Sequence, residues 1–314
     1  MALTSRVLLG HPRALQILYK LGKRIRKLKI PVESLAEGGL NAPRSKVDLE
    51  YPVFDYSPGC AIFEAELSRG TKLECLAVIR GDVPTIVSFH GALLRKKYNL
   101  PRFERLKTLA DFECNALFFS DPALRLNKRL ELAWFTGWKG LNLHELMGVW
   151  ISNFARGLGS SRVLLSGSSG GGFAALQTAP CVDDSIAVVF NPQTQLDRYL
   201  VGGRNDGFKA QHDYLKSVYP ELLTSDGGIP TNWGSLVGPK ASALDRYENV
   251  RGQRIHYWTS PNDFHHKDHF EPFAQVCDRS DNSLVPFIYE TRAGHRPPSL
   301  AIFTEAIESA LNYE

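Results

Sequence analysis

The sequence lacks any long hydrophobic run. No stretch of about 18 uncharged apolar residues, the length that a membrane-spanning helix requires, occurs in its 314 residues. Near the start, the apolar residues 7–9 are soon followed by His11, Pro12 and Arg13, so the run is shorter than the core of a secretory signal peptide. We therefore expect that no leader peptide is cleaved from this chain and that the protein stays in the cytoplasm.

Cysteine is also scarce, and the five residues are scattered. They form no C-x-x-C pair: Cys60, Cys75, Cys114, Cys181 and Cys277. An odd number at this low density argues against a disulfide framework and against a zinc site. Most of the cysteines stand in apolar sequence and are predicted to be small core residues. A catalytic thiol remains an alternative, because the number of cysteines does not decide whether one of them reacts.

Nothing in the overall composition is extreme. Hydrophobic residues make up 43% and charged residues 22%, which is ordinary for a globular protein. This balance excludes collagen-like, disordered and small disulfide-scaffold classes. There is no internal repeat and no low-complexity tract. The length suits two average domains or one large α/β domain.

The net charge of +4 is unevenly distributed. Residues 1–46 hold ten Lys or Arg against two Glu, whereas the remaining chain holds 27 basic and 31 acidic residues. Within residues 15–29 the basic residues alternate with Leu and Ile at three- and four-residue spacing, which predicts an amphipathic helix. Such a helix suits an anionic membrane surface or an acidic partner, or it is a solvated helix packed at the domain edge. Nucleic-acid binding is not expected, because the body is acidic and has no recognition motif.

Apolar, β-rich runs alternate with helical stretches from about residue 48 onward. Strands are predicted at 61–67, 73–79, 85–89, 116–119, 162–165, 186–190, 255–259 and 285–289. Helices are predicted at 143–158, 173–178 and 299–311. Strands separated by helices indicate an α/β fold, a mostly parallel twisted sheet with helices on both faces.

The alternation of strands and helices stops between residues 195 and 250. A segment this long with no strand of its own is typical of a cap or lid insertion. Its aromatic residues are candidates for shaping a substrate pocket: Tyr199, Phe208, Tyr214, Tyr219 and Trp233. The predicted organisation is therefore a basic, helical segment at 1–47 and one α/β domain at 48–312, with the cap at 195–250.

A serine lies at a glycine-rich junction between a predicted strand and a predicted helix. Gly167, Ser169 and Gly171 fit the pattern G-x-S-x-G. A nucleophile on so sharp a turn takes strained backbone angles, and side chains at the flanking positions would collide. The sequence has no G-K-[ST] after this turn and no G-x-G-x-x-G with a downstream ribose-binding acid, so a nucleotide cofactor is not expected. No other cofactor is expected either.

With this motif in place, the sequence resembles the α/β-hydrolase superfamily over about residues 50–312. The resemblance implies an acid after a later strand and a histidine after the last one. Asp263 follows the strand at 255–259, and His295 follows the strand at 285–289. The implied catalytic triad is Ser169 as nucleophile, His295 as base and Asp263 as the acid that orients the base. Asp268 is the alternative acid.

The resemblance also implies an oxyanion hole made of backbone amides. The strand at 85–89 ends in His90-Gly91-Ala92, similar to the H-G element of the superfamily. The implied donors are the amides of Gly170 and Ala92, the latter uncertain by one residue toward Gly91 or Leu93. Candidate substrate contacts at the strand ends are His90, Gly91, Asn191, Gln193 and His266.

No metal site is expected. His265 and His269 have the i, i+4 spacing of helical metal ligands, but no third ligand of clear identity accompanies them. A solvated or helix-capping cluster is the simpler interpretation, and one of these histidines is a candidate for the pocket mouth.

Three functions remain open at this point. The first is a serine hydrolase that forms an acyl-enzyme on a carboxylic ester or thioester. The second is an acyltransferase that uses the same triad on a sugar or other alcohol. The third is a non-catalytic binding protein on the same scaffold. The expected partner is a small-molecule or glycan-linked acyl substrate.

Overall fold

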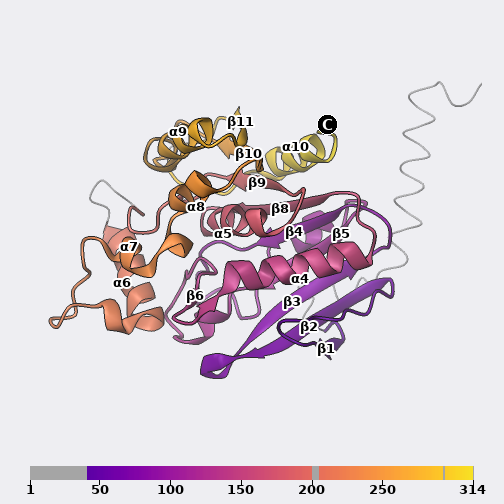
Figure 1. Cartoon of the computed structure of the whole chain (residues 1–314), viewed down its shortest axis with the longest axis horizontal. Helices are drawn as coiled ribbons and strands as arrows, with labels where there is room; N and C mark the ends of the chain where they lie inside the picture. The colour runs from indigo at the N-terminus through magenta and orange to yellow at the C-terminus, as the bar shows by residue number, and fades with distance from the viewer. Residues whose placement is uncertain (1–40, 200–204, 293, 314) are drawn as a thin grey trace, which may run out of the picture.

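In the computed structural model, residues 41–199, 205–292 and 294–313 are described. They form a nine-stranded sheet that runs through the centre of the molecule (Figure 1). In spatial order its strands are β1 (Arg44–Lys46), β2 (Gly59–Leu67), β3 (Thr71–Ile79), β5 (Asn115–Ser120), β4 (Thr85–Phe89), β8 (Val163–Ser168), β9 (Ile186–Phe190), β10 (Arg254–Thr259) and β11 (Ser283–Ile288). The predicted mostly parallel sheet is confirmed, since only β3 runs antiparallel to its neighbours β2 and β5.

The sheet begins earlier in the chain than expected. Strand β1 pairs in parallel with β2 and lies inside the segment at 1–47 for which a helix was predicted. The predicted amphipathic helix at residues 15–29 lies outside the described residues. Its contact with a membrane or an acidic partner stays a prediction.

Helices cover both faces of the sheet, because side chains of each central strand alternate between two cores. Leu165 of β8 faces the core under α4 (Leu143–Gly157) and α5 (Gly170–Thr178). Its neighbour Leu164 faces the other core, which Phe303 of α10 (Leu300–Leu311) closes. Both leucines are fully buried, as expected for strands covered on two sides.

The remaining elements are short, apart from the cap and α9. They are α3 (Leu106–Leu109), the β6 (Gly137–Trp138) and β7 (Leu141–Asn142) pair, α9 (Glu271–Arg279), a π-helical turn η6 (His266–Phe270) and the 3₁₀ turns η1 (Ser68–Gly70), η2 (Pro122–Arg125) and η3 (Ala179–Cys181). The turn η6 leads directly into α9, so the chain after β10 is helical from His266 to Arg279.

The predicted insertion is helical. It contains α6 (Asn205–Val218), η4 (Pro220–Leu222), α7 (Trp233–Val237), η5 (Pro239–Ala241) and α8 (Ala243–Asn249). Figure 1 shows α6 and α7 together beyond one end of the sheet, in orange. Tyr214 and Trp233 are buried and pack on each other. Helix α8 instead lies against the sheet domain, where the Tyr247 hydroxyl donates to the Leu176 carbonyl at 3.0 Å.

The cysteines are free thiols, as expected for core residues. All are buried except Cys181, which is half-buried. Burial raises the pKa of Cys60 to about 11 and that of Cys114 and Cys277 to about 12. These thiols are therefore protonated at neutral pH, and thiolate is the form that reacts.

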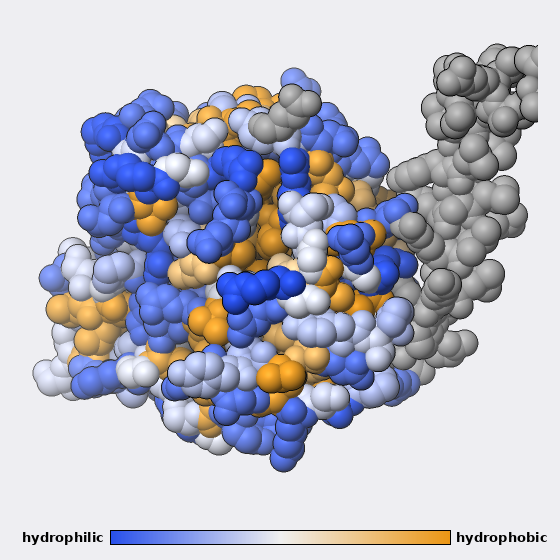
Figure 2. Space-filling view, turned by 45° about the vertical axis from the view of Figure 1, so that its right-hand side comes forward, coloured by the Kyte–Doolittle hydropathy of each residue, from blue (hydrophilic) through white to orange (hydrophobic). Residues whose placement is uncertain are grey.

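The face of the molecule in Figure 2 is mixed in polarity. Hydrophilic side chains are spread across it, and hydrophobic residues occur between them in small groups. In the described part of the chain, no helix has the length and apolar character needed to cross a membrane.

Candidate active site

Ser169 lies at the turn between β8 and α5. Its backbone angles are φ 55° and ψ −122°, a strained combination for a residue with a side chain. The flanking glycines permit the turn: a Cβ on Gly171 would lie 2.3 Å from the Phe89 carbonyl oxygen, and a Cβ on Gly167 would lie 2.3 Å from the Gly171 carbonyl. Helix α5 begins at Gly170, directly after the serine, so the unpaired amides of its first turn lie beside Ser169.

Ser169 borders a cavity of about 290 Å³ at the carboxyl ends of the parallel strands. Ligand sites in open α/β sheets usually lie at this edge. The cavity is lined by Gly91, Ala92, Leu93, Tyr98, Arg102, Glu104, Ser168, Ser169, Tyr199, His295 and Pro297. The structure thus brings Ser169 and His295, 126 positions apart in the numbering, to one cavity.

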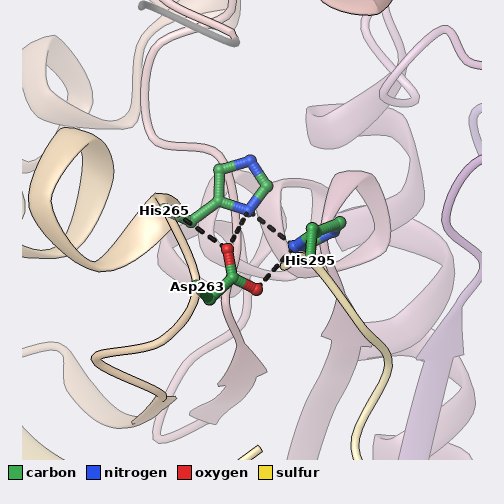
Figure 3. A group of neighbouring side chains, drawn as sticks. All are labelled: Asp263, His265 and His295. Carbon is green, nitrogen blue, oxygen red and sulfur yellow. Dashed lines mark hydrogen bonds and ion pairs between the residues drawn. The ribbon is translucent and has the colours of Figure 1, made fainter. Parts of the chain in front are cut away.

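Asp263 and His295 are in direct contact (Figure 3). The Asp263 Oδ2 atom accepts a hydrogen bond from His295 Nδ1 at 2.7 Å. The carboxylate is buried, and burial alone would raise its pKa. Hydrogen bonds from His265 and His295 outweigh that effect and hold the pKa of Asp263 well below its ordinary value. Asp263 is therefore ionised, and because His295 Nδ1 is taken up by this contact, Nε2 is the ring nitrogen left to accept a proton.

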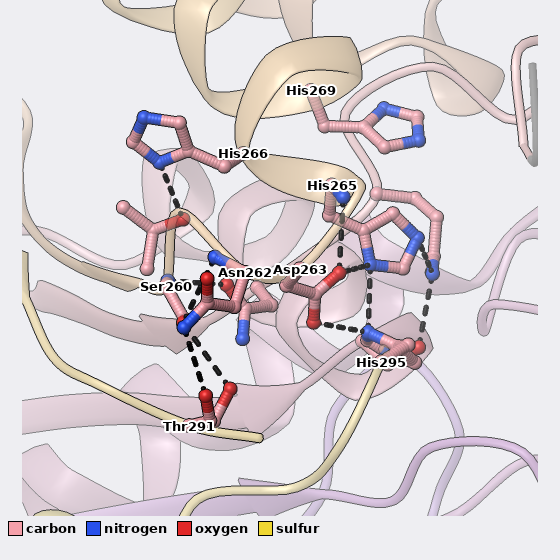
Figure 4. A network of polar contacts seen from close by, with 12 residues as sticks. Ser260, Asn262, Asp263, His265, His266, His269, Thr291 and His295 are labelled. Carbon is pink, nitrogen blue, oxygen red and sulfur yellow. Dashed lines mark hydrogen bonds and ion pairs between the residues drawn. The ribbon is translucent and has the colours of Figure 1, made fainter. Parts of the chain in front are cut away.

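A second histidine shares the same carboxylate. His265 Nδ1 lies 3.4 Å from Asp263 Oδ1 and 2.8 Å from His295 Nδ1, because both rings converge on Asp263 (Figure 4). From the sequence, His265 is expected in a solvated or helix-capping cluster or at the pocket mouth. It is in fact fully buried beside the predicted triad acid.

Gln193 connects Ser169 to His265. Its Nε2 atom donates to Ser169 Oγ at 2.9 Å and lies 3.1 Å from His265 Nε2. The Trp134 indole donates to Gln193 Oε1 at 3.1 Å, which fixes the orientation of the amide. Among the described residues, Ser169 Oγ has no hydrogen bond to His295. Gln193 donates to the hydroxyl oxygen, so the hydroxyl hydrogen stays available to a base.

The amides near the proposed oxyanion position differ in their partners. The Gly91 amide donates to Glu104 Oε2 at 3.1 Å, and the Leu93 amide donates to the Glu131 carbonyl at 2.8 Å. Within the described residues, the Ala92 amide between them has no acceptor, and neither does the Gly170 amide. Ala92 is thus the one of the three candidates whose amide is available to a ligand.

Three residues predicted as substrate contacts do not line the cavity at Ser169. His90 Nδ1 donates to the Gly91 carbonyl, its Nε2 accepts from the Asp121 amide, and burial lowers its pKa to about 4. The Asn191 side chain donates to the Tyr289 hydroxyl and accepts from the Ser260 amide. Both residues are buried structural links at the ends of strands.

His266 is the third of these. Its Nδ1 atom lies 3.1 Å from Thr259 Oγ1, and Figure 4 shows its ring on the side away from His295. Gly91 does line the cavity, and Gln193 contacts Ser169. Cavity residues that the sequence analysis missed are Tyr98, Arg102, Glu104, Ser168 and Pro297. A cluster of aromatic and charged residues just after the predicted strand at 85–89 was the available signal.

Asp263, His265 and His295 are the group of described residues whose ligand atoms could hold a metal, since these atoms lie within 4.8 Å of one another. The same atoms are already paired by hydrogen bonds. His265 and His269, which have the i, i+4 spacing of helical ligands, do not form such a pair, because His269 Nδ1 accepts from the Thr194 amide at 3.1 Å.

Comparison with known proteins identifies the fold. No family model matches the sequence, and neither does the sequence of any curated protein. Among solved structures, the capsule O-acetyltransferase of Neisseria meningitidis serogroup A is similar at a TM-score of 0.56 and 16% identity, over 79% of this chain and 93% of that one. An acetyl xylan esterase from Paenibacillus sp. R4 is similar at 0.53 and 13%, over 90% and 98%.

An acylaminoacyl peptidase from Pyrococcus horikoshii is similar at a TM-score of 0.56 and 16% identity. The match covers 81% of this chain and only 42% of the peptidase. Together with the strand order and the turn at Ser169, these similarities show that the chain has the α/β-hydrolase fold. At such low identity they establish the fold alone.

Proposed function

We propose that the chain is a serine hydrolase that forms an acyl-enzyme on carboxylic esters or thioesters. One observation carries the proposal: the Asp263–His295 pair, joined at 2.7 Å, borders the same cavity as Ser169 on its strained turn. An oriented base beside an activated hydroxyl is the arrangement that nucleophilic acyl transfer requires.

The reaction follows from these positions. Ser169 Oγ attacks the acyl carbon while His295 Nε2 takes the hydroxyl proton, and Asp263 stabilises the imidazolium that forms. The amides of Ala92 and Gly170 bind the oxyanion. The bond to the leaving alcohol or thiol then breaks, and His295 returns the proton to the leaving group. Water attacks the acyl-enzyme by the same steps in reverse and frees Ser169.

A fluorophosphonate probe tests this proposal. The probe should label the wild-type chain, and Ser169→Ala should abolish the labelling. Ser168→Ala is the matched control, because this neighbouring serine lines the same cavity on the end of strand β8, and it should be labelled like the wild type. Labelling that persists in a folded Ser169→Ala chain would contradict the proposal. A folded wild-type chain that takes no label would favour a non-catalytic binding protein.

An acyltransferase is the second candidate. The similarity to the capsule O-acetyltransferase extends over 93% of that protein, against 42% of the peptidase. The same acyl-enzyme would pass its acyl group to an alcohol in place of water. With 4-nitrophenyl acetate as donor and a sugar as acceptor, acetylated sugar that forms faster than free acetate supports transfer. Acetate as the main product at high sugar concentration supports hydrolysis.

A further inference from the structure

The wall of the cavity carries a cation for which the described residues supply no counterion. Arg102 lines the cavity together with Ser169 and His295. Within the described residues, no atom accepts a hydrogen bond from its side chain and no carboxylate lies within ion-pair distance. Its Nε atom is buried and has no partner. A buried donor left unpaired is costly, and a charged one especially so, unless a ligand pairs with it.

The guanidinium is also held in place. The Arg102 guanidinium stacks on the Tyr98 ring with its Cζ atom 4.3 Å from the ring centroid. The backbone amide of Arg102 donates to Ser120 Oγ at 3.1 Å. Stacking of this kind leaves the edge of the planar group, where its N–H donors point, free to bind a carboxylate or phosphate in two-point fashion.

The acid on the same wall does not neutralise Arg102. Glu104 lines the cavity, but its Oε2 accepts from the Gly91 amide, and Arg105 is the cation whose charge it influences. His295 is the third ionisable group of the cavity and pairs with Asp263. The Arg102 charge is thus the one that the cavity leaves uncompensated among its described residues.

We propose that Arg102 is an anion-binding residue of the cavity and that the ester cleaved there carries a negative charge, as carboxylate or phosphate, on its acyl or alcohol part. This inference rests on the proposed function. It places a selective group beside the reacting atoms, so charge would decide which esters are bound productively.

Two pairs of esters test the proposal and locate the charge. Mono-(4-nitrophenyl) succinate and its methyl ester differ by a charge on the acyl part. 3-Acetoxybenzoate and its methyl ester differ by a charge on the alcohol part. The wild type should prefer the anionic member of one pair, with kcat/KM about tenfold higher and most of the difference in KM. Arg102→Gln should remove this preference, and Arg102→Lys should keep part of it.

Lys97→Gln is the matched control, because it removes the same charge from an exposed position in the same loop. It should leave the preference intact. A preference that survives in Arg102→Gln, or an equal loss for both members of each pair, would overturn the proposal. A folded wild-type chain that prefers the anionic member of neither pair would overturn it as well.

A binding measurement separates this inference from the proposed function. In the Ser169→Ala chain, which cannot form the acyl-enzyme, calorimetry with mono-(4-nitrophenyl) succinate and 3-acetoxybenzoate should give about tenfold tighter binding of one anion than of its methyl ester. Adding Arg102→Gln should abolish the difference. If anions bind through Arg102 while no ester is cleaved by the wild type, the proposed function fails and the anion site stands.

Discussion

One carboxylate orients two imidazoles in this molecule. Asp263 accepts from His295 Nδ1, and its other oxygen faces His265 Nδ1. The Gln193 amide lies 3.1 Å from His265 Nε2, and His265 Nδ1 faces both the carboxylate, at 3.4 Å, and His295 Nδ1, at 2.8 Å. His265 thereby helps to keep Asp263 ionised, and it does so from a fully buried position that excludes water.

Replacing this carboxylate should remove most activity. We expect Asp263→Asn to lower kcat on 4-nitrophenyl acetate by about 10⁴-fold, because an amide cannot hold His295 in the tautomer that accepts the serine proton. Asp268→Asn, which changes the alternative acid in the turn η6, should retain wild-type kcat. The reverse pattern in two folded variants would assign the acid role to Asp268.

At the scale of elements, the junction of β8 and α5 is the tightest part of the site. The backbone of α5 approaches β4 so closely that Gly171 has no room for a methyl group beside the Phe89 carbonyl. Neither side of this contact can move without displacing a strand of the central sheet. Gly170 is different, because its nearest neighbour is the end of the Leu132 side chain.

We expect Gly171→Ala to lower the free energy of unfolding by about 3 kcal/mol or more, since the added methyl group meets backbone. Gly170→Ala should cost less, because a leucine side chain can change rotamer. Urea unfolding of the two variants measures the difference. Equal losses would mean that the junction is looser than the contacts of Gly171 imply.

For the whole molecule, buried histidines set the response to acid. Burial lowers the pKa of His90 and His256 to about 4 and that of His144 to about 3. In the unfolded chain these groups take up protons near pH 6.5. The unfolded state therefore binds more protons between about pH 6.5 and 4, and stability falls as the pH falls through this range.

Urea unfolding at pH 7 and pH 5 should show this loss. His256 contributes to it and has no hydrogen-bond partner for either ring nitrogen within the described residues. His256→Phe keeps an aromatic ring between Phe287 and Tyr313 and cannot be protonated. It should therefore show a smaller difference between the two pH values than the wild type. An unchanged difference would exclude His256 as a source of the acid sensitivity.

Regular features of this fold were predictable from the sequence, and the contact of Asp263 with His295 through the resemblance, but the other long-range contacts of the site were not. The strand at 85–89 and the turn at Ser169 follow from local patterns of apolar residues and glycine. His265 and His266 are adjacent, and which of them faces Asp263 depends on a π-helical turn that no local pattern indicates. The link from Trp134 through Gln193 to Ser169 joins three distant segments, so only the folded chain reveals it.

The inert cysteines make the chain a convenient background for labelling. Because the buried thiols stay protonated, a mild maleimide should react first at a cysteine introduced on the surface, for example Phe208→Cys on α6, whose native side chain is 61% exposed. A fluorophore there would report any movement of α6 relative to the sheet when an ester is added.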